Sequence, residues 1–133
     1  MRNEDKLIMS KKVNLASPKA GAKIIDVSDD FFAKCDRMLN DTDPIFIDDK
    51  YDDHGKWMDG WESRRKRVEG NDWAVIGLGG NCSIKDAIID TSHFTGNYPP
   101  AGSLDFSSHP TYEEGKMGWQ TLLEKQTLKG DHE

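Results

Sequence analysis

Cysteines and long apolar runs are scarce in this sequence. The 133 residues include two cysteines, Cys35 and Cys82, with neither the CxxC spacing of a metal or redox site nor the density of a disulfide scaffold. We expect reduced thiols, with a disulfide between the two as the alternative, and Cys35 as a small buried apolar residue. Residues 1–12 lack the continuous apolar stretch of a signal peptide or membrane helix. The expectation is a soluble, cytoplasmic protein without a membrane partner.

A basic surface is missing as well. The formal net charge is −6, and acids and bases are interspersed, so nothing forms the positive stripe that phosphate backbones require. The basic run Arg64-Arg65-Lys66-Arg67 is short and lies between tryptophans, which suits a small anionic ligand better than a nucleic acid. We therefore expect no nucleic-acid partner.

Helical periodicity is almost absent too. Short apolar runs separated by Gly, Pro, Asn and Asp recur, which is typical of an all-β domain with many turns. We expect strands at residues 23–27, 73–79 and 84–90, with one more strand pair, or its beginning, within 119–128. The strand at 73–79 is apolar on both faces and is therefore expected to be central.

Two further segments have less regular expectations. Residues 29–39 are expected to form one short helix capped by Asp29, or a packed loop, and the acidic residues 48–54 are expected to form a loop. The chain length suits one domain with a modest core. Short strands joined by polar loops predict two sheets packed face to face, a sandwich or jelly roll, with the site in the loops at one end.

Three segments combine tryptophans or a tight turn with charged residues. Residues 56–67 read Lys-Trp-Met-Asp-Gly-Trp-Glu-Ser-Arg-Arg-Lys-Arg, residues 70–73 read Gly-Asn-Asp-Trp, and residues 90–100 read Asp-Thr-Ser-His-Phe-Thr-Gly-Asn-Tyr-Pro-Pro. A solvated loop does not place tryptophans among acids and bases, and a core strand does not carry so many charges. This combination indicates the wall of a polar pocket.

The same three segments closely resemble the first repeat of the allantoicase family, and residues 15–17, 21 and 29–33 are similar to the family's opening segment. The resemblance covers residues 15–133, after an N-terminal extension at residues 1–14. It implies a galactose-binding-like jelly-roll β-sandwich, present in the family as two repeats and here as a single repeat that lacks the family's closing strands. It also implies hydrolysis of allantoate to ureidoglycolate and urea in purine breakdown.

An unclosed sandwich leaves a strand edge exposed, so a homo-oligomer is expected. The alternative function is a non-catalytic ligand-binding or assembly module on the same scaffold, or an inactive allantoicase fragment.

Allantoate hydrolysis breaks the bond between the methine carbon and a urea nitrogen. A general acid should protonate the departing urea while a base takes a proton from water. The expected catalytic residues are Asp59, Glu62 and His93, although His93 also fits simple packing beside Phe94. The sequence requires no metal ion; if a divalent ion binds, its expected ligands are Asp59, Glu62, Asp90 and His93. For Asp90, a turn cap through backbone amides is the alternative.

The carboxylate of allantoate suits the planar fork of an arginine, at about 1.5–3 kcal/mol for a hydrogen bond to a charged group. In an extended strand Arg65 and Arg67 share a face while Arg64 points away, so one pair or a single residue should bind, and solvated charges on an edge strand are the alternative. Asn97 suits recognition of a ureido group. The expected substrate-binding residues are Arg64, Arg65, Arg67, Asn97, Thr95 and Lys56.

Overall fold

A computed structural model describes residues 13–133. They form small antiparallel sheets and short 3₁₀ helices, which confirms the all-β class. The described residues divide into two compact units, one made of residues 13–43 with Ile47–Ser83, the other of Pro44–Phe46 with Ile84–Glu133. Within the described residues, no helix is long and apolar enough to cross a bilayer. The expected division between residues 1–14 and 15–133 stays a prediction, and residues 1–12 lie outside the described residues.

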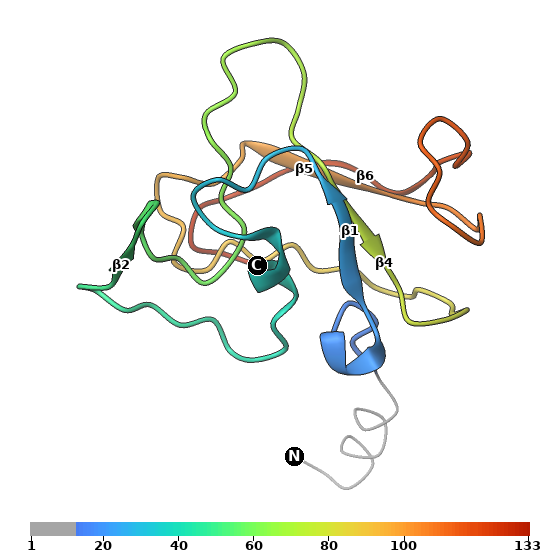
Figure 1. Cartoon of the computed structure of the whole chain (residues 1–133), viewed down its shortest axis with the longest axis horizontal. Coiled ribbons are helices and arrows are strands. Elements are labelled where there is room, and N and C mark those ends of the chain that lie inside the picture. Colours follow the sequence, from blue (N-terminus) through green and yellow to red (C-terminus); the bar gives the residue numbers. More distant parts are fainter. Residues whose placement is uncertain (1–12) are drawn as a thin grey trace, which may run out of the picture. The chain divides into compact units, whose positions relative to one another are not determined.

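The first unit contains the sheet formed by β1 (Lys23–Val27) and β4 (Ala74–Gly77), which run antiparallel side by side (Figure 1). Their β-branched residues favour extended backbone, and Ile24 lies opposite Ile76. The strand expected at residues 23–27 is confirmed. The strand expected at 73–79 is shorter, and its central position is wrong, because β4 pairs with β1 alone among residues 13–133.

The start of β1 is set by a 3₁₀ helix and a close backbone contact. The helix η1 (Pro18–Ala20) is capped by Ser17, whose Oγ accepts a hydrogen bond from Lys19 N at 3.2 Å. Gly21 follows with φ of 92°, a conformation that glycine adopts without strain. Gly79, just after β4, packs on this turn so closely that a Cβ there would lie 2.0 Å from the carbonyl oxygen of Ala20.

A second 3₁₀ helix, η2 (Cys35–Leu39), contributes Cys35 and Leu39 to the buried core. It does not begin at an Asp29 cap as expected; its N-cap is Lys34, and the Cys35 N–H donates to the Asp30 carboxylate at 3.1 Å. Burial, together with the charges of nearby aspartates, raises the pKa of the Cys35 thiol to about 12. Both cysteines are free, with Cys35 buried and Cys82 exposed.

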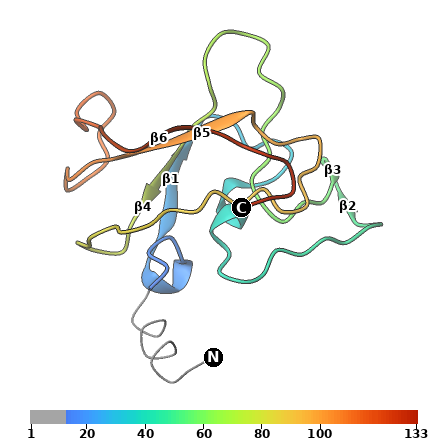
Figure 2. The same cartoon turned by 180° about the vertical axis from the view of Figure 1, so that it is seen from behind.

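The acidic stretch expected as a loop is instead a short hairpin of β2 (Tyr51–Asp52) and β3 (Gly55–Lys56), labelled in Figure 2. The Asp52 carboxylate accepts the His54 N–H at 2.8 Å and so closes the turn. This hydrogen bond, with the nearby Arg37 guanidinium 3.5 Å away, lowers the pKa of Asp52. Arg37 also lies 5.5 Å from the ring centre of Trp57, a cation–π contact.

The second unit is built on β5 (Ala101–Phe106) and β6 (Gln120–Thr127), an antiparallel pair with two register shifts (Figures 1 and 2). The expectation at residues 119–128 is confirmed as one strand, whose partner is β5 rather than a second strand in that range. The strand expected at residues 84–90 is wrong: this stretch has no regular structure, and Ile88 is 73% exposed. Its apolar residues find no partner strand among the described residues.

Candidate functional site

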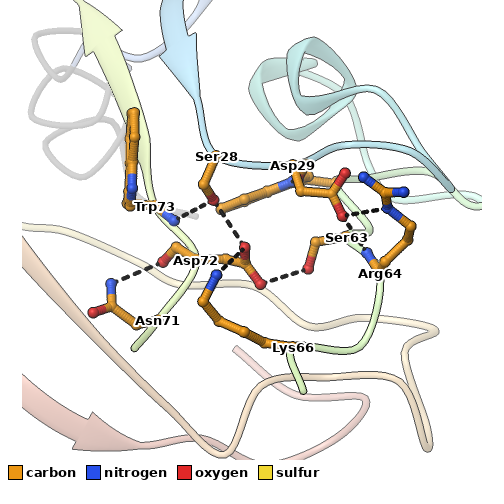
Figure 3. A network of polar contacts seen from close by, with 9 residues as sticks. Ser28, Asp29, Ser63, Arg64, Lys66, Asn71, Asp72 and Trp73 are labelled. Carbon is orange, nitrogen blue, oxygen red and sulfur yellow. Dashed lines mark hydrogen bonds and ion pairs between the residues drawn. The ribbon is translucent and has the colours of Figure 1, made fainter. Parts of the chain in front are cut away.

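The carboxylate of Asp72 connects three segments of the first unit (Figure 3). It accepts hydrogen bonds from Ser28 Oγ at 2.9 Å and from Ser63 Oγ at 3.1 Å. Lys66 Nζ lies 3.8 Å from one of its oxygens. Ser28 Oγ also accepts the Trp73 N–H at 2.9 Å, which fixes the chain where β4 begins. Together these bonds close the segment from Ser63 to Asp72 into a loop that carries the basic run.

Asp29 holds the first arginine of this run. Its Oδ2 accepts hydrogen bonds from Arg64 N at 2.7 Å and Arg64 Nε at 3.2 Å. Burial alone raises the pKa of Asp29, but the hydrogen bonds and positive charge of Arg64 outweigh it and leave the pKa below its ordinary value. The Arg64 guanidinium also lies 5.2 Å from the ring centre of Phe31. Arg64 is therefore tied to the segment that follows β1.

The cations of the basic run have contrasting surroundings. Arg64 and Lys66 are each paired with a carboxylate of the first unit. Arg65 and Arg67 are exposed and form no hydrogen bond or ion pair with the side chains that the structure describes. The alternation agrees with extended backbone, in which residues two apart share a side. Two guanidinium groups are left available to a ligand.

The other candidates of the first unit lie between β3 and the basic run. Lys56, at the end of β3, donates from Nζ to the carbonyl oxygens of residues 47–48. Glu62 is fixed through its backbone, which exchanges hydrogen bonds of 3.0 and 3.1 Å with Ala33. Asp59 is half-buried two residues before Trp61. These three residues lie close in the sequence, and the contacts of Lys56 and Glu62 are made with different segments of the chain.

In the second unit, the turn at residues 90–94 is bound by the segment around His132. Thr91 is 6% exposed, and its hydroxyl lies 2.8 Å from His132 O and accepts the His132 N–H at 3.0 Å. The Asp131 carboxylate accepts the backbone N–H of His93 at 2.8 Å. The turn therefore has its shape fixed by residues almost forty positions later in the sequence.

His93 occupies a constrained position on this turn. Its φ is 70°, which is uncommon for a residue with a side chain. Its Nε2 lies 3.3 Å from Pro44 O, and its ring stacks on Phe46 with ring centres 5.7 Å apart. Because a carbonyl oxygen only accepts, Nε2 is the donor in this contact.

The remaining candidates lie on the same turn or just after it. Asp90 Oδ1 accepts the Ser92 N–H at 2.8 Å, the turn cap that was the alternative to metal ligation. Thr95 and Asn97 are exposed. Within the described part of the chain, no three His, Cys, Asp or Glu side chains gather as metal ligands would. The expected ligand set is divided between the units, with Asp59 and Glu62 in the first and Asp90 and His93 in the second, and it stays a prediction.

Sequence reasoning gave no role to Asp72, Ser28 or Ser63. The signal that existed was the segment Gly70-Asn71-Asp72-Trp73, which carries part of the family resemblance and contains an acidic residue directly before the tryptophan that precedes β4. The two serines give no such signal, because their role depends on a carboxylate 44 residues from Ser28 and nine residues from Ser63.

The sequence of this chain is similar to an allantoicase family model and to probable allantoicases. The family model of the allantoicase repeat matches residues 13–133. A probable allantoicase of Acinetobacter baumannii strain ACICU is 50% identical over 121 residues, which are 91% of this chain and 36% of that protein. Probable allantoicase 1 of Burkholderia mallei is 51% identical over 120 residues, 90% of this chain and 36% of that protein.

Two solved structures similar to this chain are also allantoicases. A structure of allantoicase matches with a TM-score of 0.71 at 24% identity, covering 99% of this chain and 43% of that one. The crystal structure of allantoicase from Saccharomyces cerevisiae matches with a TM-score of 0.67 at 26% identity, covering 99% and 42%. The fold is thus that of an incomplete β-sandwich repeat.

The model of the allantoicase repeat matches about nine-tenths of the sequence. The chain belongs to the allantoicase family. It spans about a third of the length of the curated relatives that it matches.

Proposed function

We propose that this chain takes part in the hydrolysis of allantoate to ureidoglycolate and urea, as one repeat of an allantoicase. The observation that supports this most is the allantoicase-repeat match over residues 13–133, a span that contains every candidate residue. The relatives named above are probable allantoicases. We further propose that the active form is a homo-oligomer, since the sheets among the described residues have two strands each and leave strand edges that a second copy can pair with.

The arginines of the basic run are the proposed carboxylate ligands. Arg65 and Arg67 support this role best, because both are exposed and form no ion pair with residues 13–133. Arg64 and Lys56 donate hydrogen bonds within the chain, so they would bind substrate only through N–H groups that these hydrogen bonds do not use. Thr95 and Asn97 are proposed to bind the ureido groups through their side-chain donors and acceptors.

Proton transfer is assigned to Asp59, Glu62 and His93. In the proposed mechanism a base takes a proton from the attacking water while an acid protonates the departing urea nitrogen. If His93 is the base, Nδ1 is the atom that accepts the proton, because Nε2 donates to Pro44 O. The carboxyl group of Asp59 or Glu62 is the proposed acid, which gives a proton to the departing urea nitrogen.

The test is urea release from allantoate by the purified chain, with and without added Mn²⁺ and after chelation. We expect release by the folded chain, and an Arg65→Gln, Arg67→Gln double variant should raise KM by about ten- to a hundredfold for each charged hydrogen bond that it removes, since each contributes about 1.5–3 kcal/mol. Lys85→Gln, which removes an exposed charge elsewhere, is the matched control and should leave KM unchanged. A chain that is folded by circular dichroism and releases no urea under any of these conditions contradicts the proposal.

A binding or assembly module is the second candidate, because the exposed Arg65 and Arg67 would bind an anion whether or not chemistry follows. It predicts that allantoate binds, or that the chain associates, without turnover. Calorimetry with allantoate and light scattering after size exclusion measure these two properties directly. Measured urea release, lost in the Asp59→Asn or His93→Gln variant, would leave this alternative without support.

A further inference from the structure

The four basic residues of the loop from Ser63 to Asp72 differ in whether a carboxylate is paired with them. Arg64 and Lys66 are each held by a carboxylate, with contact distances of 3.2 and 3.8 Å. Arg65 and Arg67, which alternate with them, are exposed and without a charged partner among the described residues. Figure 3 shows Arg64 in contact with Asp29 and Lys66 in contact with Asp72.

The base of the loop is held by hydrogen bonds from uncharged donors to carboxylates, in addition to the ion pairs. Ser28 and Ser63 both donate to the Asp72 carboxylate, whose side chain is 20% exposed. The Arg64 backbone N–H donates to Asp29, whose side chain is 19% exposed. Bonds at partly buried carboxylates restrict the backbone on both sides of Arg65 and leave the outward residues free to meet a ligand.

From this geometry we infer that Asp72 and Asp29 are positioning residues for a carboxylate-binding pair formed by Arg65 and Arg67. The inference rests on the proposed function, because allantoate supplies the carboxylate. Asp72 does not touch the substrate; it binds Lys66 and Ser63, and thereby holds the neighbouring arginines in one arrangement. A forked contact with a carboxylate depends on this, since each guanidinium must present two donors in fixed directions.

Removing the charge of Asp72 should change the dissociation constant for an anion in opposite directions, depending on whether Asp72 acts through its charge or by positioning the arginines. A carboxylate near two arginines weakens the local attraction for an anion, so its neutralisation should tighten anion binding if Asp72 acts through charge alone. If Asp72 acts by positioning, neutralisation should weaken binding, because the loop loses the ion pair with Lys66 and part of its hydrogen bonding. The direction of the change in dissociation constant separates the two.

The experiment measures allantoate binding to the full chain by calorimetry at low ionic strength, for wild type, Asp72→Asn, Ser63→Ala and Glu69→Gln. Glu69 lies on the same loop and is exposed, so Glu69→Gln makes the same charge change without removing a described contact. We expect Asp72→Asn to raise the dissociation constant about tenfold, as a misplaced binding group does. Ser63→Ala, with no charge change, should raise it by a smaller factor, and Glu69→Gln should leave it equal or lower.

Thermal unfolding of each variant shows whether the loop change is local. If Asp72→Asn does not fold, Ser63→Ala carries the same test, and an unchanged dissociation constant in that variant overturns the inference. Tighter binding by Asp72→Asn, or equal weakening by Glu69→Gln, also overturns it, as does the absence of allantoate binding by the wild type. Allantoate binding without urea release contradicts the proposed hydrolysis and leaves the positioning of the arginine pair supported by the variants.

Discussion

Replacing Gly79 by alanine should destabilise the first unit, whereas the same change at Gly80 should not. A Cβ at position 79 would lie 2.0 Å from the carbonyl oxygen of Ala20 and 2.9 Å from the Cα of Gly21. No heavy atom lies within 4 Å of a Cβ at position 80. Because the atoms met at position 79 belong to the backbone, no change of rotamer relieves the clash, and the two segments must separate by about 1.3 Å to reach an ordinary C···O contact.

The expected magnitude follows from these distances. Overpacking in a well-packed region costs about 1–3 kcal/mol, and the rigidity of backbone places Gly79→Ala in the upper half of that range. Alanine also restricts the unfolded chain, which stabilises by about 0.4–1 kcal/mol at a position that accepts it. We therefore expect a net loss of about 2 kcal/mol for Gly79→Ala, and a change between zero and a gain of about 1 kcal/mol for Gly80→Ala.

Urea unfolding of the two variants and the wild type, followed by tryptophan fluorescence, measures this difference. A loss of about 2 kcal/mol corresponds to a midpoint of thermal unfolding lower by about 8 °C for a chain of this size. Free energies of unfolding that agree within about 0.5 kcal/mol between the two alanine variants would refute the close contact between the turn after η1 and the segment after β4.

Three further predictions concern stability and reactivity. Thr91→Val removes the hydroxyl bonded to His132 and should lower the free energy of unfolding by about 1–2 kcal/mol, against less than about 1 kcal/mol for Thr91→Ser; urea unfolding measures both, and equal losses would contradict the hydrogen-bond explanation. Ellman's reagent at pH 8 should react with one thiol of the folded chain, because Cys82 is exposed while Cys35 is buried with its pKa raised to about 12, and Cys82→Ser should abolish the reaction. The pKa of Asp29 is lowered in the folded chain, so its ionised carboxylate stabilises the fold at pH values above the unfolded-state pKa of about 3.9. This stabilisation is lost as the pH falls through the folded-state pKa. Asp29→Asn should therefore destabilise the chain more at pH 7 than at pH 2.5, and equal losses at the two pH values would count against the pairing with Arg64.

Local composition was enough to predict part of the fold. The run at residues 23–27 is rich in β-branched residues and forms β1, and the apolar run that contains β4 was identified for the same reason. The strand β5 begins Ala-Gly-Ser, residues of low strand propensity, and exists because β6 pairs with it. Residues 84–90 show the reverse: their isoleucines favour a strand, but no described segment lies in position to supply the backbone hydrogen bonds.

The candidate site was predictable in residue type and not in pairing. The basic run and its position between tryptophans are visible in the sequence. The expected separation of Arg64 from Arg65 and Arg67 agrees with the pairing of Arg64 with Asp29, although residues 64–67 form no strand. Arg64 is paired with a carboxylate 35 residues earlier in the sequence, and Lys66 is paired with a different one, Asp72. Spacing along the chain contains no information about a contact of that kind until the strands that bring the two segments together are known.

The binding of the turn at residues 90–94 by the segment around His132 also sets an order of assembly. Thr91 and His132 are 41 residues apart, and the entropy lost on closing a flexible loop grows with its length. Pairing of β5 with β6 shortens the effective loop between them, so the hairpin should form before the turn closes. The turn that carries Asp90 and His93 should then be among the last parts of the second unit to fold and among the first to open when the hairpin frays. Amide hydrogens of residues 91–94 would accordingly exchange with solvent faster than those at the centre of β5, even though both lie in the same unit.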